Sequence, residues 1–472
     1  MVAAIREPTT GTAGRNGLTA AERAAVGKAA RSVVPRSRHA EFARDPKAPP
    51  PLALLAGQDE HRVPELLPIR YERMALSPFS YFRGAALPMA SDLVGTPRTG
   101  LTVQACGDAH LSNFGLFASP ERRLVFDIND FDETLPGPWE WDVKRLAASL
   151  EIAGRDNGYP RKRRHEIVTA AVAEYRRAMR EFSRWTVLRV WYAHADVETV
   201  ESTYAGRFSA ARRRKLSRTT EKARARDHLG ALRKFTRIAD GVPRIASDPP
   251  LIVRVEELGV RKERAVQLID ELQGVVAAYR ETLEPDRRLL LDRYRMADFA
   301  RKVVGVGSVG TRCWMLLLLG KDDQDPLFLQ AKEAGPSVLE DYLGPSEFGN
   351  CGQRVVVGQR LMQAVSDIFL GWVRVTGLDG RTRDFYLRQL RDWKGSADID
   401  TMEPAGMLVY GRLCGWTLAR AHARTGDAIA IGSYLGSGTS FDAAIGEFAR
   451  VYADQNERDH AALLDSVRAG GR

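Results

Sequence analysis

The feature that most constrains this chain is a polar loop that follows directly on a short apolar segment. Residues 101–106 and residues 123–128 are both short apolar runs, and we expect each to form a strand. The first is followed by Gly107-Asp108-Ala109-His110-Leu111-Ser112-Asn113, and the second by Asn129-Asp130-Phe131-Asp132. Acidic and amide side chains therefore gather at the ends of two predicted strands, where one substrate can meet them.

Asp108 and Asn113 have the chemistry that phosphoryl transfer requires. In that reaction a carboxylate orients the attacking hydroxyl and accepts its proton, and an amide oxygen a few residues further on binds Mg²⁺. Asp108 is therefore the candidate catalytic residue, and Asn113 is a candidate metal ligand. A turn rich in Asp and Asn, with no catalytic role, explains the same residues and stays open at this point.

Three aspartates at the second strand form a candidate site for a hard cation. Mg²⁺ is usually bound by one or two carboxylates together with substrate phosphates. Asp127, Asp130 and Asp132 cannot all point the same way, because successive residues of a strand face opposite sides. We prefer Asp130 as the ligand and keep Asp127 as a candidate; a solvated turn with helix-capping aspartates is the alternative.

The motif Gly305-Val306-Gly307-Ser308-Val309-Gly310 is a candidate phosphate-binding loop. GxGxxG fits both the dinucleotide-binding turn and the kinase glycine loop. A dinucleotide-binding turn opens a helix, whereas this motif opens a predicted strand at 314–319. Lys332 then lies inside the next strand, where a kinase carries the lysine that pairs with nucleotide phosphates. Gly305, Gly307, Ser308, Gly310 and Lys332 are therefore candidate nucleotide ligands, and a plain hairpin is the alternative for the glycines alone.

The pattern of apolar residues predicts an α+β chain with a helical lobe and a smaller β lobe. About five strands are expected, at 302–304, 314–319, 327–332, 369–375 and 384–390, with a helix between the third and the fourth. Residues 141–299 and those from 405 onward have helical spacing. We divide the chain into a flexible or loosely docked arm (1–60), a catalytic loop with the helical lobe (61–298), a nucleotide-binding β lobe (299–395) and helices that return to the helical lobe (396–472).

Composition narrows the class of protein further. The net charge of +10 favours acidic ligands such as nucleotides, phosphates or nucleic acid, and residues 207–237 are densely basic. No apolar run approaches the roughly 20 residues of a membrane span, and the first 30 residues lack the apolar core of a secretory signal. Four scattered cysteines fit a reduced, cytoplasmic protein better than a disulfide scaffold. The eight histidines have no ligand spacing, so we expect His110 and His422 to be packed residues.

These motifs resemble those of a known group of enzymes. Gly107-Asp108-x-His110-x2-Asn113, followed by Asn129-Asp130-Phe131, resembles the signature of aminoglycoside phosphotransferases and related small-molecule kinases. Asp142 lies twelve residues after Asp130, where that signature continues with a D-L-A segment, and this spacing favours Asp130 over Asp127 as the metal ligand. From about residue 70 the chain also resembles an uncharacterised bacterial family, domain of unknown function 2252, through residues 77–84, 126–133 and 452–455.

The order of the motifs departs from that of an ordinary kinase. There the glycine loop and the lysine precede the catalytic loop, whereas here they follow it. The helix that leads into the catalytic loop of a phosphotransferase is most similar to Leu418-Ala419-Arg420-Ala421-His422-Ala423, near the C-terminus. The resemblance therefore implies a circularly permuted, protein-kinase-like fold. It also implies a carboxylate partner for Lys332, for which Glu340 is the candidate, and an adenine-binding hinge at Gln389 and Leu390.

The function expected from the sequence is an ATP- and Mg²⁺-dependent phosphotransferase acting on a hydroxyl acceptor that the sequence does not name. A nucleotide-binding regulatory module, of the kind formed by inactive kinases, keeps the same site without the reaction. A metal-dependent phosphoesterase is a weaker alternative, because Gly-Asp-x-His also occurs in such enzymes. The last alternative is a nucleic-acid-binding protein that uses the basic segment 207–237.

Overall fold

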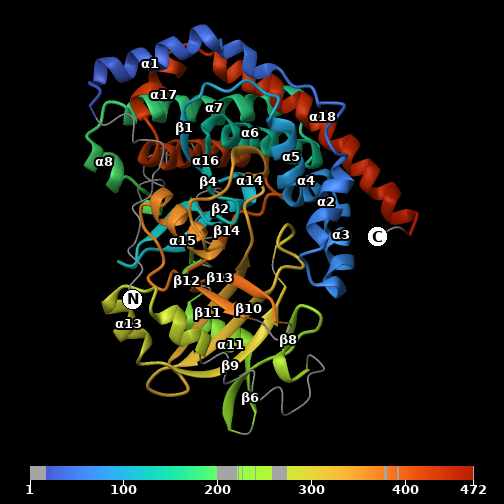
Figure 1. Cartoon of the computed structure of the whole chain (residues 1–472), viewed down its shortest axis with the longest axis vertical. Coiled ribbons are helices and arrows are strands. Elements are labelled where there is room, and N and C mark those ends of the chain that lie inside the picture. Colours follow the sequence, from blue (N-terminus) through green and yellow to red (C-terminus); the bar gives the residue numbers. More distant parts are fainter. Residues whose placement is uncertain are drawn as a thin grey trace.

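The long helices gather at one end of the molecule and the large β sheet at the other, with shorter helices and strands at both ends (Figure 1). The computed structural model describes residues 17–198, 220–221, 223–225, 227–239, 241–257, 274–303, 305–376, 380–390 and 393–470. Within these ranges the chain is a mixed α+β structure, as expected. Residues 199–219, which include the start of the basic segment 207–237, lie outside the described residues.

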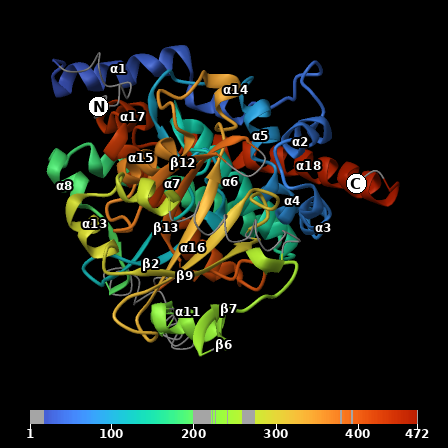
Figure 2. The ribbon, with the colours of Figure 1, turned by 60° about the horizontal axis from the view of Figure 1, so that its bottom comes forward.

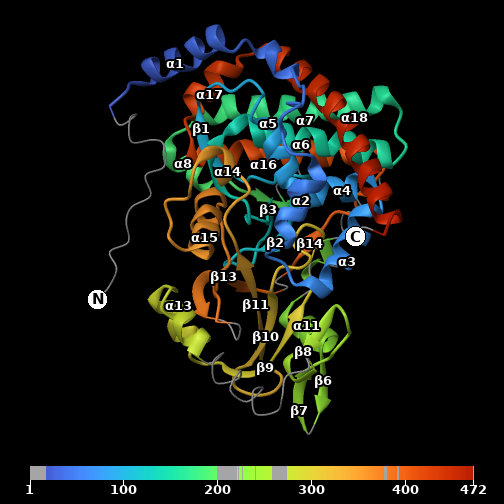
Figure 3. The ribbon, with the colours of Figure 1, turned by 45° about the vertical axis from the view of Figure 1, so that its right-hand side comes forward.

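Long helices form the upper lobe and bury most of its apolar side chains. They are α6 (Trp139–Asp156), α7 (Arg161–Phe182), α16 (Pro404–Thr425), α17 (Ala428–Leu435) and α18 (Ser440–Arg468). Helix α6 is buried on nearly all sides from Trp139 to Gly154, so it is the central helix of the lobe. Helix α16 packs closely on α7, where a side chain at Gly415 would overlap the carbonyl oxygen of Ala171. Figure 3 shows the C-terminal helices α16, α17 and α18 beside α6 and α7 in this lobe.

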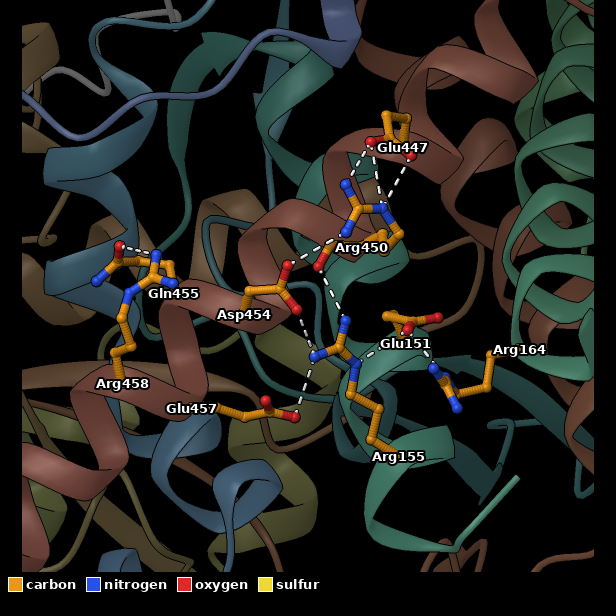
Figure 4. Close-up of polar contacts among 9 residues, drawn as sticks. All are labelled: Glu151, Arg155, Arg164, Glu447, Arg450, Asp454, Gln455, Glu457 and Arg458. Carbon is orange, nitrogen blue, oxygen red and sulfur yellow. Dashed lines mark hydrogen bonds and ion pairs between the residues drawn. The ribbon is translucent and has the colours of Figure 1, made fainter. Parts of the chain in front are cut away.

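An ion-pair network ties the last helix, α18, to the central helix (Figure 4). Arg155 of α6 contacts Asp454 at 2.8 Å and Glu457 at 3.1 Å, both on α18. Glu151 accepts from Arg155 and from Arg164 of α7, at 3.0 and 2.9 Å. Partly exposed pairs contribute little singly, but together they fix the orientation of α18 on the helix that supports the site.

Residues 17–59, in the segment we expected to be a flexible or loosely docked arm, carry helices that pack on the rest of the protein. Helix α1 (Ala20–Val33) begins at a capping box formed by Thr19 and Glu22. It lies along α17 (Figures 1 and 2), where Arg23 pairs with Asp427 at 2.9 Å. The next helices are η1 (Arg36–Ala40), α2 (Pro51–Asp59), η2 (Pro64–Leu66), α3 (Leu67–Ala75), α4 (Pro78–Gly84) and α5 (Ala86–Leu93).

The lower lobe is built on an antiparallel sheet of six described strands in the order β12-β13-β11-β10-β9-β8. Their bounds are β8 (Ile252–Arg254), β9 (Arg295–Lys302), β10 (Cys313–Leu319), β11 (Pro326–Ala334), β12 (Gly371–Thr376) and β13 (Thr382–Gln389). Helix α15 (Cys351–Met362) runs between β11 and β12 in the chain and packs on β12 and β13. The five-strand prediction needs two corrections: the first strand begins seven residues before residue 302, and β8 adds a sixth strand too short for an alternating pattern.

The prediction of helix throughout 141–299 is wrong beyond α8 (Val187–Tyr192). Four short strands interrupt this stretch, namely β5 (Ala195–Asp196), β6 (Thr236–Ala239), β7 (Val242–Ile245) and β8, with α11 (His228–Phe235) and α13 (Pro285–Leu291) among them. Strands of two to four residues are set by their pairing partners, because they are too short to give a period of their own.

The two strands expected around the polar loop belong to different sheets. Strand β1 (Thr102–Ala105) pairs with β4 (Leu135–Pro138). Strand β3 (Leu124–Ile128) pairs with β2 (Phe114–Ala118), which begins directly after Asn113. The β2–β3 hairpin therefore joins the end of the first polar loop to Asn129 and Asp130. Among the described residues, no helix is both long and apolar enough to cross a lipid bilayer.

Candidate functional site

A polar pocket of about 130 Å³ lies between the two lobes, and six of the twelve predicted site residues line it. Those residues are Asp108, Asn113, Asp130, Gly305, Gly307 and Ser308. The wall also includes residues that were not predicted as site residues, namely Gln58, Arg62, Arg83, Gly84, Ala86, His110, Asp132, Glu133, Val306 and Thr311. The segments around 108, 130 and 305 thus form one cavity, although they are far apart in the chain.

Lys332 of β11, in the lower lobe, does not itself line the pocket, but it contacts two aspartates that do. Its side chain is 3% exposed, and its ammonium pairs with Asp132 and lies 3.8 Å from the carboxylate of Asp130. Tyr386, the cross-strand neighbour of Lys332 on β13, donates a hydrogen bond to Asp132 at 2.8 Å. Burial acts to lower the pKa of Lys332, but the two carboxylates hold it well above its usual value. The lysine is therefore a fixed cation in the site.

Asp130 is held in its ionised form. Burial acts to raise its pKa, but Lys332 and Arg388 outweigh burial and keep the pKa below the usual value for an aspartate. A carboxylate that stays ionised and faces a polar pocket is suited to bind a divalent cation.

Asp108 and Asn113 are arranged by the short loop between β1 and β2. The Nδ2 of Asn113 donates to the backbone oxygen of Asp108 at 2.8 Å, which leaves the amide oxygen of Asn113 as the group that can meet a cation. Arg145 of α6 pairs with the Asp108 carboxylate at 2.7 Å. Burial raises the pKa of Asp108 although Arg145 acts in the opposite direction, so this carboxylate is a stronger base than an exposed aspartate.

Asp142 fixes the backbone at the start of the loop. Its carboxylate accepts hydrogen bonds from the amides of Cys106 and Gly107, at 2.6 and 2.9 Å. His422 of α16 lies 3.0 Å from the same carboxylate and 2.9 Å from the hydroxyl of Tyr175. His422 is buried, as expected, and in addition it links the C-terminal helix α16 to the loop that carries Asp108.

Gly107 is required at the start of this loop. It has a φ of +81°, a backbone conformation that L side chains rarely adopt. A Cβ at this position would also overlap the carbonyl oxygen of Glu133. The loop that holds Asp108 and the segment after Asp130 can approach each other only because residue 107 has no side chain.

The glycine loop is covered by the N-terminal helices. Arg73 of α3 donates to the carbonyl oxygen of Gly305 at 2.6 Å, and the amide of Val63 donates to that of Gly310 at 2.8 Å. Gly307 lies against the backbone of Arg83, since a Cβ there would be 3.1 Å from the Arg83 carbonyl oxygen. Gly310 itself does not line the pocket.

Arg83 brings an unpaired positive charge to the pocket. No hydrogen bond or ion pair joins its guanidinium to any described residue, and its Nε is buried without a partner. Burial lowers the pKa of Arg83, whereas Asp400 and Asp108 act to raise it. A half-buried guanidinium whose Nε has no partner is costly and is suited to an anionic ligand such as a phosphate.

Two predicted residues have other partners. Asp127 is 2% exposed, pairs with Arg420 of α16 and does not line the pocket. Glu340 accepts hydrogen bonds from the amides of Ser337 and Ser346, at 2.8 and 3.1 Å, and lies 3.7 Å from Arg354. Asp132, not Glu340, is the ion-pair partner of Lys332.

The predicted hinge lies at a second cavity, of about 290 Å³, next to the polar pocket. Gln389 lines it, together with Leu116, Ile368 and Phe369, and the backbone amide of Gln389 donates to Asp367. The amide of Leu390 donates to Phe328 at 2.8 Å within the sheet, and Leu390 is not part of the lining. The two cavities share no lining residue, but Asn129 lines the second cavity and its chain neighbour Asp130 lines the polar pocket, so the cavities approach each other at this point.

Sequence reasoning missed the cations around the site, and one signal could have found Arg83. It ends the aromatic stretch Ser77-Pro78-Phe79-Ser80-Tyr81-Phe82-Arg83-Gly84, an unusual composition before a glycine. Arg62 and Arg145 lie in ordinary helical or loop sequence, where nothing distinguishes them from other arginines. Among the described residues, no group of three or more His, Cys, Asp or Glu side chains is placed to hold a metal ion.

Comparison with known proteins gives one match. The model of the bacterial family described as "Uncharacterized protein conserved in bacteria (DUF2252)" matches residues 62–466. The chain belongs to the DUF2252 family. The matched region contains every predicted site residue, and it begins at Arg62, the first arginine of the pocket wall. No curated protein and no solved structure matches the chain.

Proposed function

We propose that this DUF2252 protein is an ATP- and Mg²⁺-dependent phosphotransferase with a circularly permuted, protein-kinase-like fold. The observation that carries the proposal is the 3.8 Å approach of Lys332 to Asp130 at a pocket also lined by Asp108, Asn113 and the glycine loop. Phosphoryl transfer needs these groups together, because one nucleotide and its metal must contact all of them. An unrelated fold would have no reason to bring them to one cavity.

The junction between α16 and β1 supports the permutation. The amide of Gln104 in β1 donates to the hydroxyl of Thr425 at 3.2 Å, and a side chain at Gly426 would meet Val103. Helix α16, which resembles the helix that leads into the catalytic loop of a phosphotransferase, thus ends against the strand that precedes Asp108, although α16 lies near the other end of the chain. In an unpermuted chain, α16 would continue directly into β1.

The order of parts in the lower lobe also supports the proposal. Strand β9, the glycine loop, β10, β11 with Lys332, and then helix α15 follow one another as in the nucleotide lobe of a kinase. One part differs. Kinases pair the lysine with a glutamate of the helix, whereas α15 presents Arg354, which donates to the carbonyl oxygens of Asp132 and Gly335 at 2.8 Å. Asp132 takes the place of the missing glutamate.

Each group at the pocket has a role in this chemistry. Asp108 would orient the acceptor hydroxyl and accept its proton, and Asp130 and the amide oxygen of Asn113 would hold Mg²⁺. When bound, Mg²⁺ supplies positive charge that offsets the charge on the transferred phosphoryl group. Lys332 and Arg83 would neutralise phosphate oxygens, and the glycine backbone would approach them closely. The neighbouring cavity, with Leu116 and Phe369, would accept the base of the nucleotide.

A second candidate function is nucleotide binding without transfer. The observation that favours it is the Arg145–Asp108 ion pair, which occupies one oxygen of the catalytic carboxylate. If this pair persists with substrate bound, the protein binds ATP and turns over nothing.

Turnover of ATP by the purified protein distinguishes the two candidates. With Mg²⁺ and γ-labelled ATP, and with water as the fallback acceptor, we expect slow release of labelled phosphate. Asp108→Asn should reduce this rate by about 10²-fold or more while ATP still binds. Asp322→Asn, in the turn between β10 and β11 with a side chain that is 49% exposed, is the matched control and should keep the wild-type rate. Binding without any release, or equal release by the Asp108 variant, would favour the regulatory module.

A further inference from the structure

A second basic cleft lies at the end of the helical lobe that is farthest from the β sheet, beside α1 and α17 (Figure 1). It has a volume of about 430 Å³. Three segments contribute its five cationic side chains: Lys28 and Arg31 from α1, Arg36 from η1, and Arg180 and Arg184 from the C-terminal end of α7 and the residues after it. The rest of the lining is Ser183 and the small residues Gly432, Ser433, Gly436, Ser437 and Gly438.

Two of the arginines are fixed in place by the end of helix α17. Arg31 donates to the carbonyl oxygen of Tyr434 at 2.7 Å, and Arg36 donates to that of Leu435 at 2.5 Å. Both guanidinium groups lie against Gly436, because a Cβ there would be 2.8 Å from Arg36 and 2.9 Å from Arg31. Gly436 has a φ of +63°. The backbone thus holds two like charges next to each other before any ligand arrives.

The positive charge of the cleft is not balanced within the described part of the chain. None of the lining residues is acidic, and none of the five cations forms an ion pair with a described carboxylate. Burial is the main cause that lowers the pKa of Arg31, and the like charge of the neighbouring Arg36 lowers it further. Other arginines of the helical lobe form ion pairs with a carboxylate of a different segment. Examples are Arg23, Arg44, Arg155 and Arg176.

We propose that this cleft binds a small molecule that carries two or more phosphate groups. Guanidinium groups bind phosphate oxygens in a planar, two-point geometry, and the fixed pair at Gly436 presents two of them side by side. The side chains of Lys28, Arg180 and Arg184 have no hydrogen-bond partner among the described residues, so their charges are available for a second phosphate. The hydroxyls of Ser433 and Ser437 add neutral donors at the same wall. The site is separate from the pocket around Lys332, and the inference does not depend on the proposed phosphotransferase activity.

The test is calorimetric titration of the full chain with inorganic tripolyphosphate and with inorganic phosphate, at fixed ionic strength. The test variant is Lys28→Glu with Arg180→Glu, because these side chains make no contacts that the fold needs. The matched control is Arg163→Glu with Arg177→Glu, two arginines of α7 that are 62% and 56% exposed and that change the net charge equally. A thermal melt checks that both variants fold.

We expect tripolyphosphate to bind at least about tenfold more tightly than phosphate, since its several phosphate groups can contact more of the five cations at once. The cleft variant should lose at least tenfold in affinity for tripolyphosphate, and the control variant should stay within about twofold of the wild type. Absence of binding at millimolar tripolyphosphate would overturn the proposal. An equal loss in both variants would overturn it too, because the binding would then follow net charge and not this cleft.

Discussion

The ammonium group of Lys332 lies 3.8 Å from the carboxylate of Asp130, although one comes from the large β sheet and the other from a loop of the helical lobe. The same ammonium pairs with Asp132. This contact joins the two lobes at the cavity that also holds Asp108 and Asn113. In a nucleotide complex, Lys332 would exchange the carboxylates for phosphate oxygens, and Asp130 would be free to bind the metal.

Gly107→Ala should lower the free energy of unfolding more than Gly100→Ala does. Both Gly107 and Gly100 have a positive φ, of +81° and +76°, but a Cβ at Gly100 would meet nothing within 4 Å. Gly100→Ala should therefore cost about 1 kcal/mol from backbone strain alone. Gly107→Ala should cost about 2 kcal/mol more, because the loop must move away from Glu133. Urea unfolding measures both costs, and equal losses would mean that the loop tolerates the shift.

Asp142→Asn should weaken the support of the catalytic loop. An asparagine has one acceptor oxygen for the amides of Cys106 and Gly107, and its NH₂ group would face a donor. We expect a loss of about 2–3 kcal/mol in the free energy of unfolding, together with weaker ATP binding. Asp454→Asn, at a carboxylate that is 40% exposed (Figure 4), is the control and should change stability by less than about 0.5 kcal/mol. If Asp142→Asn changed neither the free energy of unfolding nor ATP binding, the role given to this residue would be contradicted.

Glu133 predicts a pH dependence of stability. Burial raises the pKa of this carboxyl to about 7, although the amide of Val338 donates to it at 2.7 Å. The pKa is therefore higher in the folded state than in the unfolded chain. The contribution of this group to the free energy of unfolding is fully present below about pH 4.5 and is lost as the pH rises through about 7. The loss by pH 8 is up to about 3 kcal/mol.

Glu133→Gln removes that titration. Relative to the wild type, the variant should be stabilised at pH 8 by up to about 3 kcal/mol more than at pH 5, measured by urea unfolding at both values. Glu121→Gln, at an exposed glutamate, corrects for the general effect of losing one negative charge. Parallel pH curves for the wild type and the Glu133 variant would show that Glu133 is already ionised in the fold at low pH.

Arg83→Met should separate binding from stability. The guanidinium has no partner among the described residues, so its removal should leave the free energy of unfolding unchanged or raise it. ATP affinity should fall by about tenfold, because one positive charge that faces the phosphates is lost. Arg98→Met, at an exposed arginine, makes the same change in net charge away from the pocket. It should change neither the free energy of unfolding nor the ATP affinity. Unchanged ATP affinity in the Arg83 variant would remove this residue from the proposed site.

The motifs could be predicted from the sequence because each depends on local chemistry. Asp108, Asn113 and Asp130 lie in short loops after strands, and the strand that carries Lys332 is a long apolar run, so their context is visible in a few residues. The main sheet was predicted for the same reason. Short strands such as β5 and β8 were missed, since strands of two or three residues are defined by the partner they pair with.

Partners across the site could not be predicted in the same way. Glu340 was chosen for Lys332 because kinases place a glutamate on the following helix, but the chain folds Asp132 against the lysine instead. The charges of Arg83 and Arg145 reach the pocket because of how α4 and α6 pack in three dimensions. No local sequence pattern predicts this packing. Likewise, the N-terminal arm has little apolar periodicity, and it docks through the close approach of Gly27 to the backbone of Ala430 and through ion pairs such as Arg23–Asp427.

The most direct test of the central claim is the thermal melt of the full chain with and without ATP and Mg²⁺. Three proteins are compared: the wild type, the double variant Lys332→Ala with Asp130→Ala, and Lys321→Ala, a lysine in the turn of the same sheet that is 82% exposed. A ligand at 100 times its dissociation constant adds about 2.7 kcal/mol, which is enough to raise the melting temperature visibly. We predict a Mg²⁺-dependent rise in the wild type and in Lys321→Ala and none in the double variant. No rise in the wild type at millimolar ATP, or an equal rise in the double variant, would contradict a nucleotide site at Lys332 and Asp130.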